Sequence, residues 1–168
     1  MKILIFSDIH YEAEPLMSAI RENRDAEYVL FLGDGLSQLE DAAKEFPYTA
    51  FVAVRGNCDL FSIGTRFNDC PLVKVLTIDN IRIFMCHGHT LNLDMLAYTA
   101  AQNGATVALF GHTHQTYHEI CKLSDGREIT LFNPGTIGAP RNDPRFTYGI
   151  MEIKNGTFKL AHKTQKTL

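Results

Sequence analysis

The sequence lacks any apolar run close to the roughly 20 residues that a membrane-spanning helix requires. Residues 1–8 also lack the long apolar region and the small-residue cleavage site of a signal peptide. We therefore expect no membrane partner and a cytoplasmic location. A CxxC pair is absent as well, and we expect reduced thiols, as in a cytosolic protein. The cysteines are Cys58, Cys70, Cys86 and Cys121.

Neither sign of charge is in large excess. The net charge of -3 gives no general reason to expect a nucleic acid as partner. Hydrophobic residues make up 45% of the 168 residues, which is enough for one sizeable core. Because the chain also lacks repeats, linkers and low-complexity segments, we expect a single domain over residues 1–168.

The order of apolar segments predicts the fold class. The first half has the βαβ alternation of an α/β protein, with strands over 2–7, 28–32 and 49–54 and helices over 12–23 and 36–46. The second half is expected to be mostly antiparallel, since turn signals such as Asp125-Gly126 and Asn155-Gly156 separate its strands. Those strands are expected over 73–78, 81–86, 115–123, 128–132, 147–153 and 158–162, and a helix over 93–103 precedes a strand over 105–110. We expect an α/β (α+β) protein with two sheets packed face to face and helices outside.

A pair of histidines follows the buried strand predicted over 105–110. In Gly111-His112-Thr113-His114 the two imidazoles are two residues apart. Residues with this spacing point to the same side of an extended segment, so both rings can face one point. This arrangement indicates a metal site.

Four further motifs also stand at the ends of apolar runs, where ligands of open α/β sheets gather. They are Asp8-Ile9-His10, Gly33-Asp34, Gly56-Asn57-Cys58-Asp59 and His87-Gly88-His89. This mixture of carboxylate, imidazole and amide groups suits borderline divalent metals better than calcium, and it is too large for one tetrahedral zinc. We expect two divalent metal ions that share a carboxylate, manganese first, with nickel, iron, zinc or magnesium as alternatives.

Such a metal pair, about 3.5–4 Å apart, can generate hydroxide and stabilise an in-line displacement at phosphorus. The charges of the motifs agree with this chemistry. Asp8 and Asp34 offset only two of the four positive charges of two divalent ions, and the neutral Asn57 preserves the excess. The excess favours a bound hydroxide and an anionic phosphate.

The five motifs, in this order, resemble those of the calcineurin-like metallophosphoesterase superfamily. The short length, the Gly56-Asn57-Cys58-Asp59 variant and the later Asn133-Pro134-Gly135-Thr136 and Pro140-Arg141 segments are similar to small YfcE-type phosphodiesterases, which are related to the retromer scaffold subunit. The resemblance covers residues 1–158 and implies a four-layer αββα sandwich, the metallophosphoesterase fold. It also implies two sets of metal ligands: Asp8, His10, Asp34 and His114 for one ion, and Asp34, Asn57, His87 and His112 for the other.

Three residues of the motifs are candidates for catalytic work beside the metals. His89 can face the same site as His87, where we expect it to orient a ligand or contact phosphate rather than to bind metal. We expect Asp59 to orient the loop that presents Asn57. Cys58 stands where many relatives have histidine, and a thiol is a poor substitute for an imidazolium. When cysteine replaces histidine, the phosphate loses a cationic partner, and this loss weakens the binding of a monoester dianion more than that of a diester monoanion.

The remaining residues have weaker signals. Residues 133–136 either bring backbone N–H groups to the site or brace it as a structural turn, and Arg141 either contacts phosphate or lies in solvent. Phe61 and Phe67 are more typical of a core than of base stacking. We expect His118 and His162 to be surface residues.

The sequence thus predicts a metal-dependent phosphodiesterase in which a hydroxide bridging two metals attacks a small-molecule phosphodiester. Cyclic nucleotides, nucleotide diesters and phospholipid-derived diesters all stay open as substrates. The alternatives are a phosphomonoesterase on the same site and a protein-binding scaffold like the retromer subunit. The resemblance also implies a homodimer or homotetramer.

Overall fold

The computed structural model describes residues 1–10, 13–59, 64–138 and 145–165. The expectations for Phe61 and Arg141 lie outside these residues. In chain order the elements are β1 (Lys2–Phe6), α1 (Glu14–Glu22), β2 (Tyr28–Phe31), α2 (Leu36–Glu45), β3 (Ala50–Ala53), β4 (Val73–Ile78), β5 (Ile81–Cys86), α3 (Leu93–Gln102), β6 (Val107–Leu109), β7 (Thr116–Lys122), β8 (Glu128–Pro134), β9 (Phe146–Lys154) and β10 (Thr157–Gln165). The main difference from the predicted bounds is β10, which runs beyond residue 162 because it pairs with β9 along its whole length.

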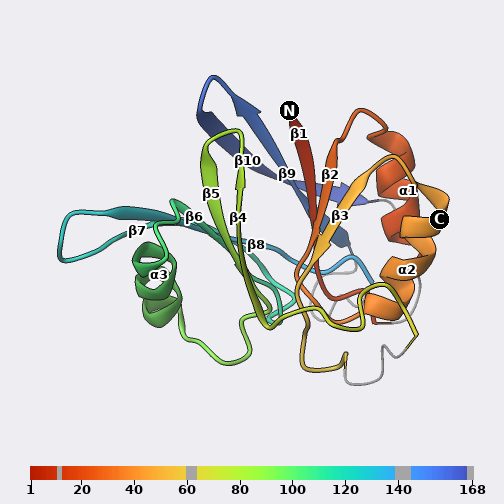
Figure 1. The fold of residues 1–168 in the computed structure, drawn as a ribbon, viewed down its shortest axis with the longest axis horizontal. Helices are drawn as coiled ribbons and strands as arrows, with labels where there is room; N and C mark the ends of the chain where they lie inside the picture. Colours follow the sequence, from red (N-terminus) through yellow and green to blue (C-terminus); the bar gives the residue numbers. More distant parts are fainter. Residues whose placement is uncertain (11–12, 60–63, 139–144, 166–168) are drawn as a thin grey trace.

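The strands form two five-stranded sheets (Figure 1). The first has the order β10-β9-β1-β2-β3, in which β1, β2 and β3 are parallel. The second has the order β4-β5-β6-β8-β7, and its central strands β5, β6 and β8 are also parallel. This centre departs from the mostly antiparallel second half that the sequence predicted. The reason is that α3 carries the chain back from β5 to β6, and a helical crossover joins parallel strands.

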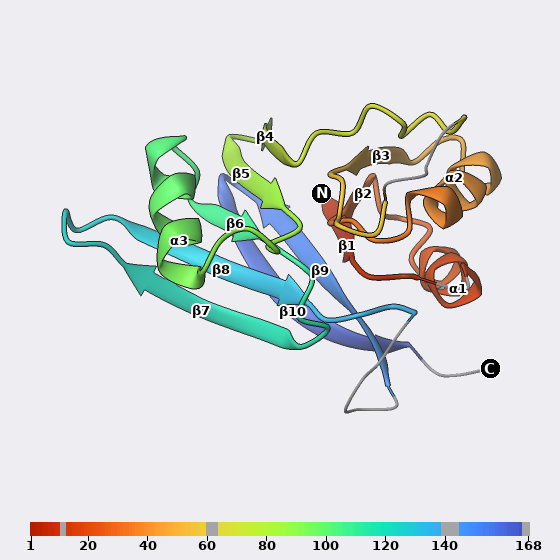
Figure 2. The same ribbon diagram turned by 90° about the horizontal axis from the view of Figure 1, so that it is seen from below.

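Three apolar clusters separate four layers. On β1, Leu4 and Phe6 pack towards α1 and α2, whereas Ile3 and Ile5 point between the two sheets. On the far side, Phe84 and Ala108 of the second sheet pack under α3. Figure 2 shows α3 on one side of the sheets and α1 and α2 on the other. The four-layer αββα sandwich is therefore confirmed.

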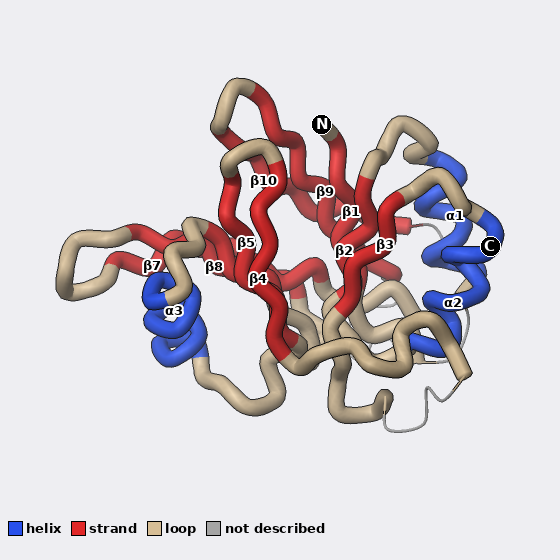
Figure 3. The backbone as a smooth tube through the Cα atoms, viewed as in Figure 1, coloured by secondary structure: helices blue, strands red, loops and turns tan. Residues whose placement is uncertain are grey.

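The loops after the parallel strands lie at one edge of the sandwich (Figure 3). Short backbone hydrogen bonds join them: the amide of Asp8 donates to the carbonyl of Gly33 at 3.0 Å, and that of Gly111 donates to His87 at 2.9 Å. All five motifs of the sequence stand in these loops. No helix in the described ranges has the length and apolar character to span a membrane.

Candidate metal centre

The motif residues have an unusual backbone. Five of them have a positive φ, between 56° and 69°, in the left-handed region that residues other than glycine rarely adopt. Such conformations cost free energy and cluster at functional sites, where the surrounding structure holds them. These residues are Asp8, His10, Asp34, His112 and His114.

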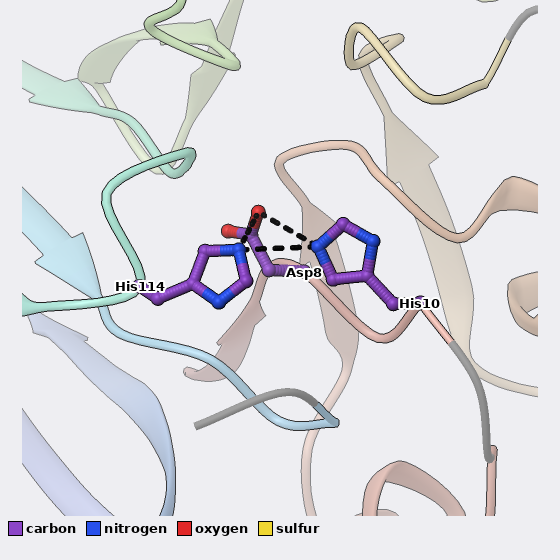
Figure 4. A group of neighbouring side chains, drawn as sticks. All are labelled: Asp8, His10 and His114. Atoms are coloured by element: carbon purple, nitrogen blue, oxygen red, sulfur yellow. Dashed lines mark hydrogen bonds and ion pairs between the residues drawn. The ribbon is translucent and has the colours of Figure 1, made fainter. Parts of the chain in front are cut away.

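Asp8, His10 and His114 converge on one point (Figure 4). The Nε2 atoms of His10 and His114 are 3.1 Å apart. Asp8 Oδ1 lies 3.2 Å from His114 Nε2 and 3.6 Å from His10 Nε2. The ring centroids of His10 and His114 are 5.0 Å apart in a stacked arrangement. Two imidazole nitrogens and a carboxylate oxygen at these separations can ligate a single cation.

His87 forms a second group with Asp8 and Asp34. Its Nδ1 lies 2.7 Å from the carbonyl oxygen of Leu32 and must donate to it, because a carbonyl only accepts. In the neutral form of the ring, the Nε2 lone pair therefore faces Asp34 Oδ2 at 3.2 Å and Asp8 Oδ1 at 3.9 Å. A lone pair that faces two carboxylates is stabilised only by a proton or a cation between them.

Buried atoms without hydrogen bonds support a cation at this place. Asp8 Oδ1 and His87 Nε2 are buried and have no hydrogen-bond partner among the described residues. Buried polar atoms are nearly always satisfied, so each exception requires an explanation such as an ion. Divalent cations beside these atoms would satisfy both of them, and the donor set fits the two metal ions expected.

The electrostatics of the centre favour ionised carboxylates. Burial alone would raise the pKa of Asp8, but His10 and His114 outweigh it and hold this pKa far below its usual range. Burial likewise opposes the lowered pKa of Asp34, for which the contact with His87 is the main cause. In turn, Asp34 and Asp8 raise the pKa of His87 against the effect of its burial.

Asp59 joins two loops of the centre. Its Oδ2 accepts from the amides of Asp34 at 2.7 Å and Gly56 at 2.8 Å. Its Oδ1 accepts from Gly35 at 2.8 Å and Leu36 at 3.0 Å, at the start of α2. Asp59 therefore fixes the loop before α2 as well as its own loop, and it satisfies two backbone amides at the start of that helix.

Cys58 and Asn57 form the exposed border of the centre. The amide of Cys58 donates to Asp34 Oδ1 at 2.7 Å, and Asn57 Nδ2 donates to the Cys58 sulfur at 3.3 Å. Burial and the charge of Asp34 raise the pKa of Cys58 to about 11, so the thiol is neutral at neutral pH. An open pocket lined by His10, Gln38 and Cys58 leads to the carboxylates.

His112 and His89 lie beside His87 rather than within the two closest groups. The ring centroids of His112 and His89 are 5.2 Å and 5.5 Å from that of His87. The amide of His112 donates to Asp8 Oδ2 at 3.0 Å. Burial and the neighbouring His87 lower the pKa of both His89 and His112. Both rings therefore favour the neutral form that can accept a proton or bind a metal.

Two buried residues of the 133–136 segment brace the centre. Asn133 Nδ2 donates to the carbonyl of Gly111 at 2.8 Å and to Thr113 Oγ1 at 3.1 Å. Thr136 Oγ1 donates to the carbonyl of Asp8 at 2.7 Å. Of the two interpretations of this segment, the contacts favour the structural turn. Phe67 is buried in the core, as expected.

The expectation that His162 is a surface residue was wrong. Its Nε2 lies 2.8 Å from the carbonyl oxygen of Asn133, and its ring stacks on Phe132. A signal for this place was present, since Phe158, Leu160 and His162 alternate along one face of β10 and the first two pack into the core between the sheets. His118 is exposed, as expected.

Comparisons with known proteins identify the family of the chain. Residues 1–156 match the model of the calcineurin-like phosphoesterase superfamily domain. The probable metallophosphoesterase YsnB of Bacillus subtilis is 31% identical, over 92% of this chain and 86% of that protein. The phosphodiesterase YfcE of Escherichia coli is 26% identical, over 90% of this chain and 88% of its own. A solved structure of a predicted phosphoesterase from Streptococcus pneumoniae has the same fold, with a TM-score of 0.72, 24% identity and coverage of 97% and 88%.

Proposed function

Since the chain belongs to the calcineurin-like phosphoesterase superfamily, we propose that it is a metal-dependent phosphodiesterase that hydrolyses small phosphodiesters. The observation that carries the proposal is the convergence of Asp8 Oδ1 and His87 Nε2, two buried atoms that lack hydrogen-bond partners among the described residues. Their separation of 3.9 Å suits ligands of a shared metal centre.

We assign the metal ligands from the two groups of side chains and from the resemblance to the superfamily. Asp8, His10 and His114 would hold one ion, and His87 would hold the other together with Asn57 and His112. Asp34 lies 4.0 Å from His10 Nε2 and 3.2 Å from His87 Nε2, so it could contribute to both sites. When bound, a pair of divalent metals supplies Lewis-acid stabilisation of the phosphoryl transition state and activates the attacking water as hydroxide. We propose manganese as the native metal.

The residues around the metals set the choice of substrate. Cys58 presents a neutral thiol at the open side of the centre, where a histidine could offer a cation. A diester monoanion needs less positive charge than a monoester dianion, so the thiol favours diesters. The ring of His89 lies beside those of His87 and His112, at centroid distances of 5.5 Å and 6.1 Å, and we assign His89 to the phosphate or the leaving oxygen.

The test compares hydrolysis of an aryl phosphodiester with that of its monoester after the metal-free protein has been loaded with Mn²⁺. We expect faster turnover of the diester, and faster turnover of the monoester would favour the phosphomonoesterase instead. Asp34→Asn should abolish both metal binding and activity. Asp41→Asn is the matched control, because the Asp41 side chain is 67% exposed on α2. If the protein binds no metal and hydrolyses no phosphoester, the result would instead support a function as a protein-binding scaffold.

A panel of natural diesters then narrows the substrate. Cyclic nucleotides, nucleotide diesters and phospholipid-derived diesters are compared under the same Mn²⁺ loading, with Asp34→Asn as the blank. The panel is repeated with Ni²⁺, Zn²⁺, Fe²⁺ and Mg²⁺, and manganese is refuted as the native metal if another of these ions gives the higher activity.

A further inference from the structure

A histidine outside the metal centre connects the two sheets. His162 lies on β10 of the first sheet, opposite Gly149 of β9. Its ring stacks on Phe132 of the second sheet, with centroids 4.4 Å apart and an interplanar angle of 12°. A Cβ atom on Gly149 would lie 2.5 Å from the Phe132 ring, so this glycine makes the close approach of the sheets possible.

The same histidine holds the backbone of Asn133. The carbonyl of Asn133 can only accept, so His162 Nε2 carries the proton and donates to it at 2.8 Å. Burial lowers the pKa of His162, and the opposing effect of the Asn133 carbonyl is smaller. The ring is therefore neutral near pH 7, with its proton on the nitrogen that faces Asn133.

Asn133 has one amide orientation only. Its Oδ1 accepts from the amide of Gly135 at 2.9 Å, while its Nδ2 donates to Gly111 and Thr113. These two contacts stand at both sides of His112, whose backbone has a φ of 69°. Asn133 thus holds the turn of residues 111–114 in the left-handed conformation that directs its histidines to the centre.

The contact between His162 and Asn133 matters because the proposed metal ligands come from both sheets. Asp8, His10 and Asp34 follow strands of the first sheet, whereas His87, His112 and His114 follow strands of the second. A small slide of one sheet on the other would separate His114 from Asp8 and His10. A hydrogen bond between the sheets, close to the turn, opposes that slide.

We propose that His162 is a positioning residue of the metal centre, which acts through Asn133 on the turn that carries His112 and His114. Its effect on metal binding rests on the proposed function, but its effect on the turn does not. The N–H group that it presents to Asn133 is the feature that matters, rather than the packing of its ring.

Three variants separate these two features. His162→Gln keeps an N–H donor at the reach of Nε2 but loses the ring, and His162→Asn is too short to donate. His162→Phe retains the stacking on Phe132 without a donor, and provides the same test in a variant with an intact core. The control is His118→Asn, since exposed His118 contacts the same Phe132 ring edge-on.

The first readout uses the metal-free protein. Backbone amide signals of residues 111–114 in ¹H–¹⁵N NMR spectra should shift and broaden in His162→Asn and His162→Phe, and should keep their wild-type positions in His162→Gln and His118→Asn. Unchanged signals in the variants without a donor would overturn the proposal. So would an equal perturbation in His162→Gln.

The second readout is the Kd for Mn²⁺ by calorimetry, beside the unfolding midpoint. His162→Asn should weaken binding by about three- to tenfold, as expected for one lost hydrogen bond, and His162→Gln should restore it. A lower midpoint with an unchanged Kd would show a purely structural role and refute the proposal. If the wild-type protein binds none of Mn²⁺, Ni²⁺, Zn²⁺, Fe²⁺ and Mg²⁺, the proposed function fails, and the metal-free spectra alone decide the role of His162.

Discussion

Replacement of Asp59 by asparagine should destabilise the protein strongly, because each of its carboxylate oxygens accepts two backbone hydrogen bonds. Asp34 and Gly56 donate to Oδ2, and Gly35 and Leu36 donate to Oδ1. Asparagine offers one acceptor oxygen, and its amide group would face two N–H donors. Those two donors would be left unsatisfied in a buried place.

The magnitude follows from these lost contacts. A buried donor without a partner costs about 1–3 kcal/mol, and a negative charge at a helix N-terminus contributes about 0.5 kcal/mol more. We therefore expect Asp59→Asn to lower the free energy of unfolding by about 3–5 kcal/mol. For a chain of this size the midpoint of thermal unfolding would fall by about 6–20 °C.

The assay is urea unfolding followed by circular dichroism, in the presence of EDTA so that no metal contributes to stability. Asp41→Asn is the matched control, and a surface substitution of this kind should change the free energy of unfolding by at most about 0.5 kcal/mol. A loss below about 1 kcal/mol in Asp59→Asn would refute the assignment of Asp59 as the brace between these two loops.

Three further predictions concern the turn, the substrate and pH. Gly111→Ala should abolish metal binding in calorimetry, because the new Cβ would lie 1.9 Å from Ser7 Oγ, whereas Gly126→Ala meets no atom within 4 Å and should cost only about 1 kcal/mol in urea unfolding. Cys58→His should raise the ratio of monoester to diester turnover at least about tenfold by adding a cation and proton donor, and an unchanged ratio would refute the role given to the thiol. His162 has a lowered pKa in the folded state, so its contribution to stability is complete above its unfolded pKa of about 6.5 and is lost as pH falls through the folded value. Urea unfolding at pH 8 and pH 5.5 should therefore show a smaller loss of stability on acidification in His162→Phe than in the wild-type protein, and an equal loss would contradict the shift.

Much of the fold follows from local signals. The alternation on β1, with Ile3 and Ile5 on one face and Leu4 and Phe6 on the other, requires apolar cover on both faces of its sheet. Turns predicted from short motifs formed where expected: Asn155 and Gly156 both have a positive φ and close the hairpin of β9 and β10. The helices could be predicted from the periodicity of their own apolar residues, and they end within a few residues of the predicted bounds.

The pairing of the strands was harder to predict from the sequence. The segments that became β9 and β10 read as another hairpin of the antiparallel half, but β9 pairs with β1 and completes the first sheet. That choice depends on which sheet edge is free after β1, β2 and β3 have paired. Contacts between residues so distant along the chain leave no periodic signal in either segment.

The sequence by itself determined where the candidate residues stand: carboxylates and imidazoles follow apolar strands, and the strand period and the turn residues are local properties. Only the tertiary structure decided how these residues are held. Asp59 braces two loops rather than its own alone, and the half-buried His162 holds the carbonyl of Asn133. Both depend on backbone groups of distant segments, whose N–H and C=O are the same in every residue and carry no signature in the sequence. The proposed ligands can thus be recognised from local sequence, whereas their alignment depends on the packing of the two sheets.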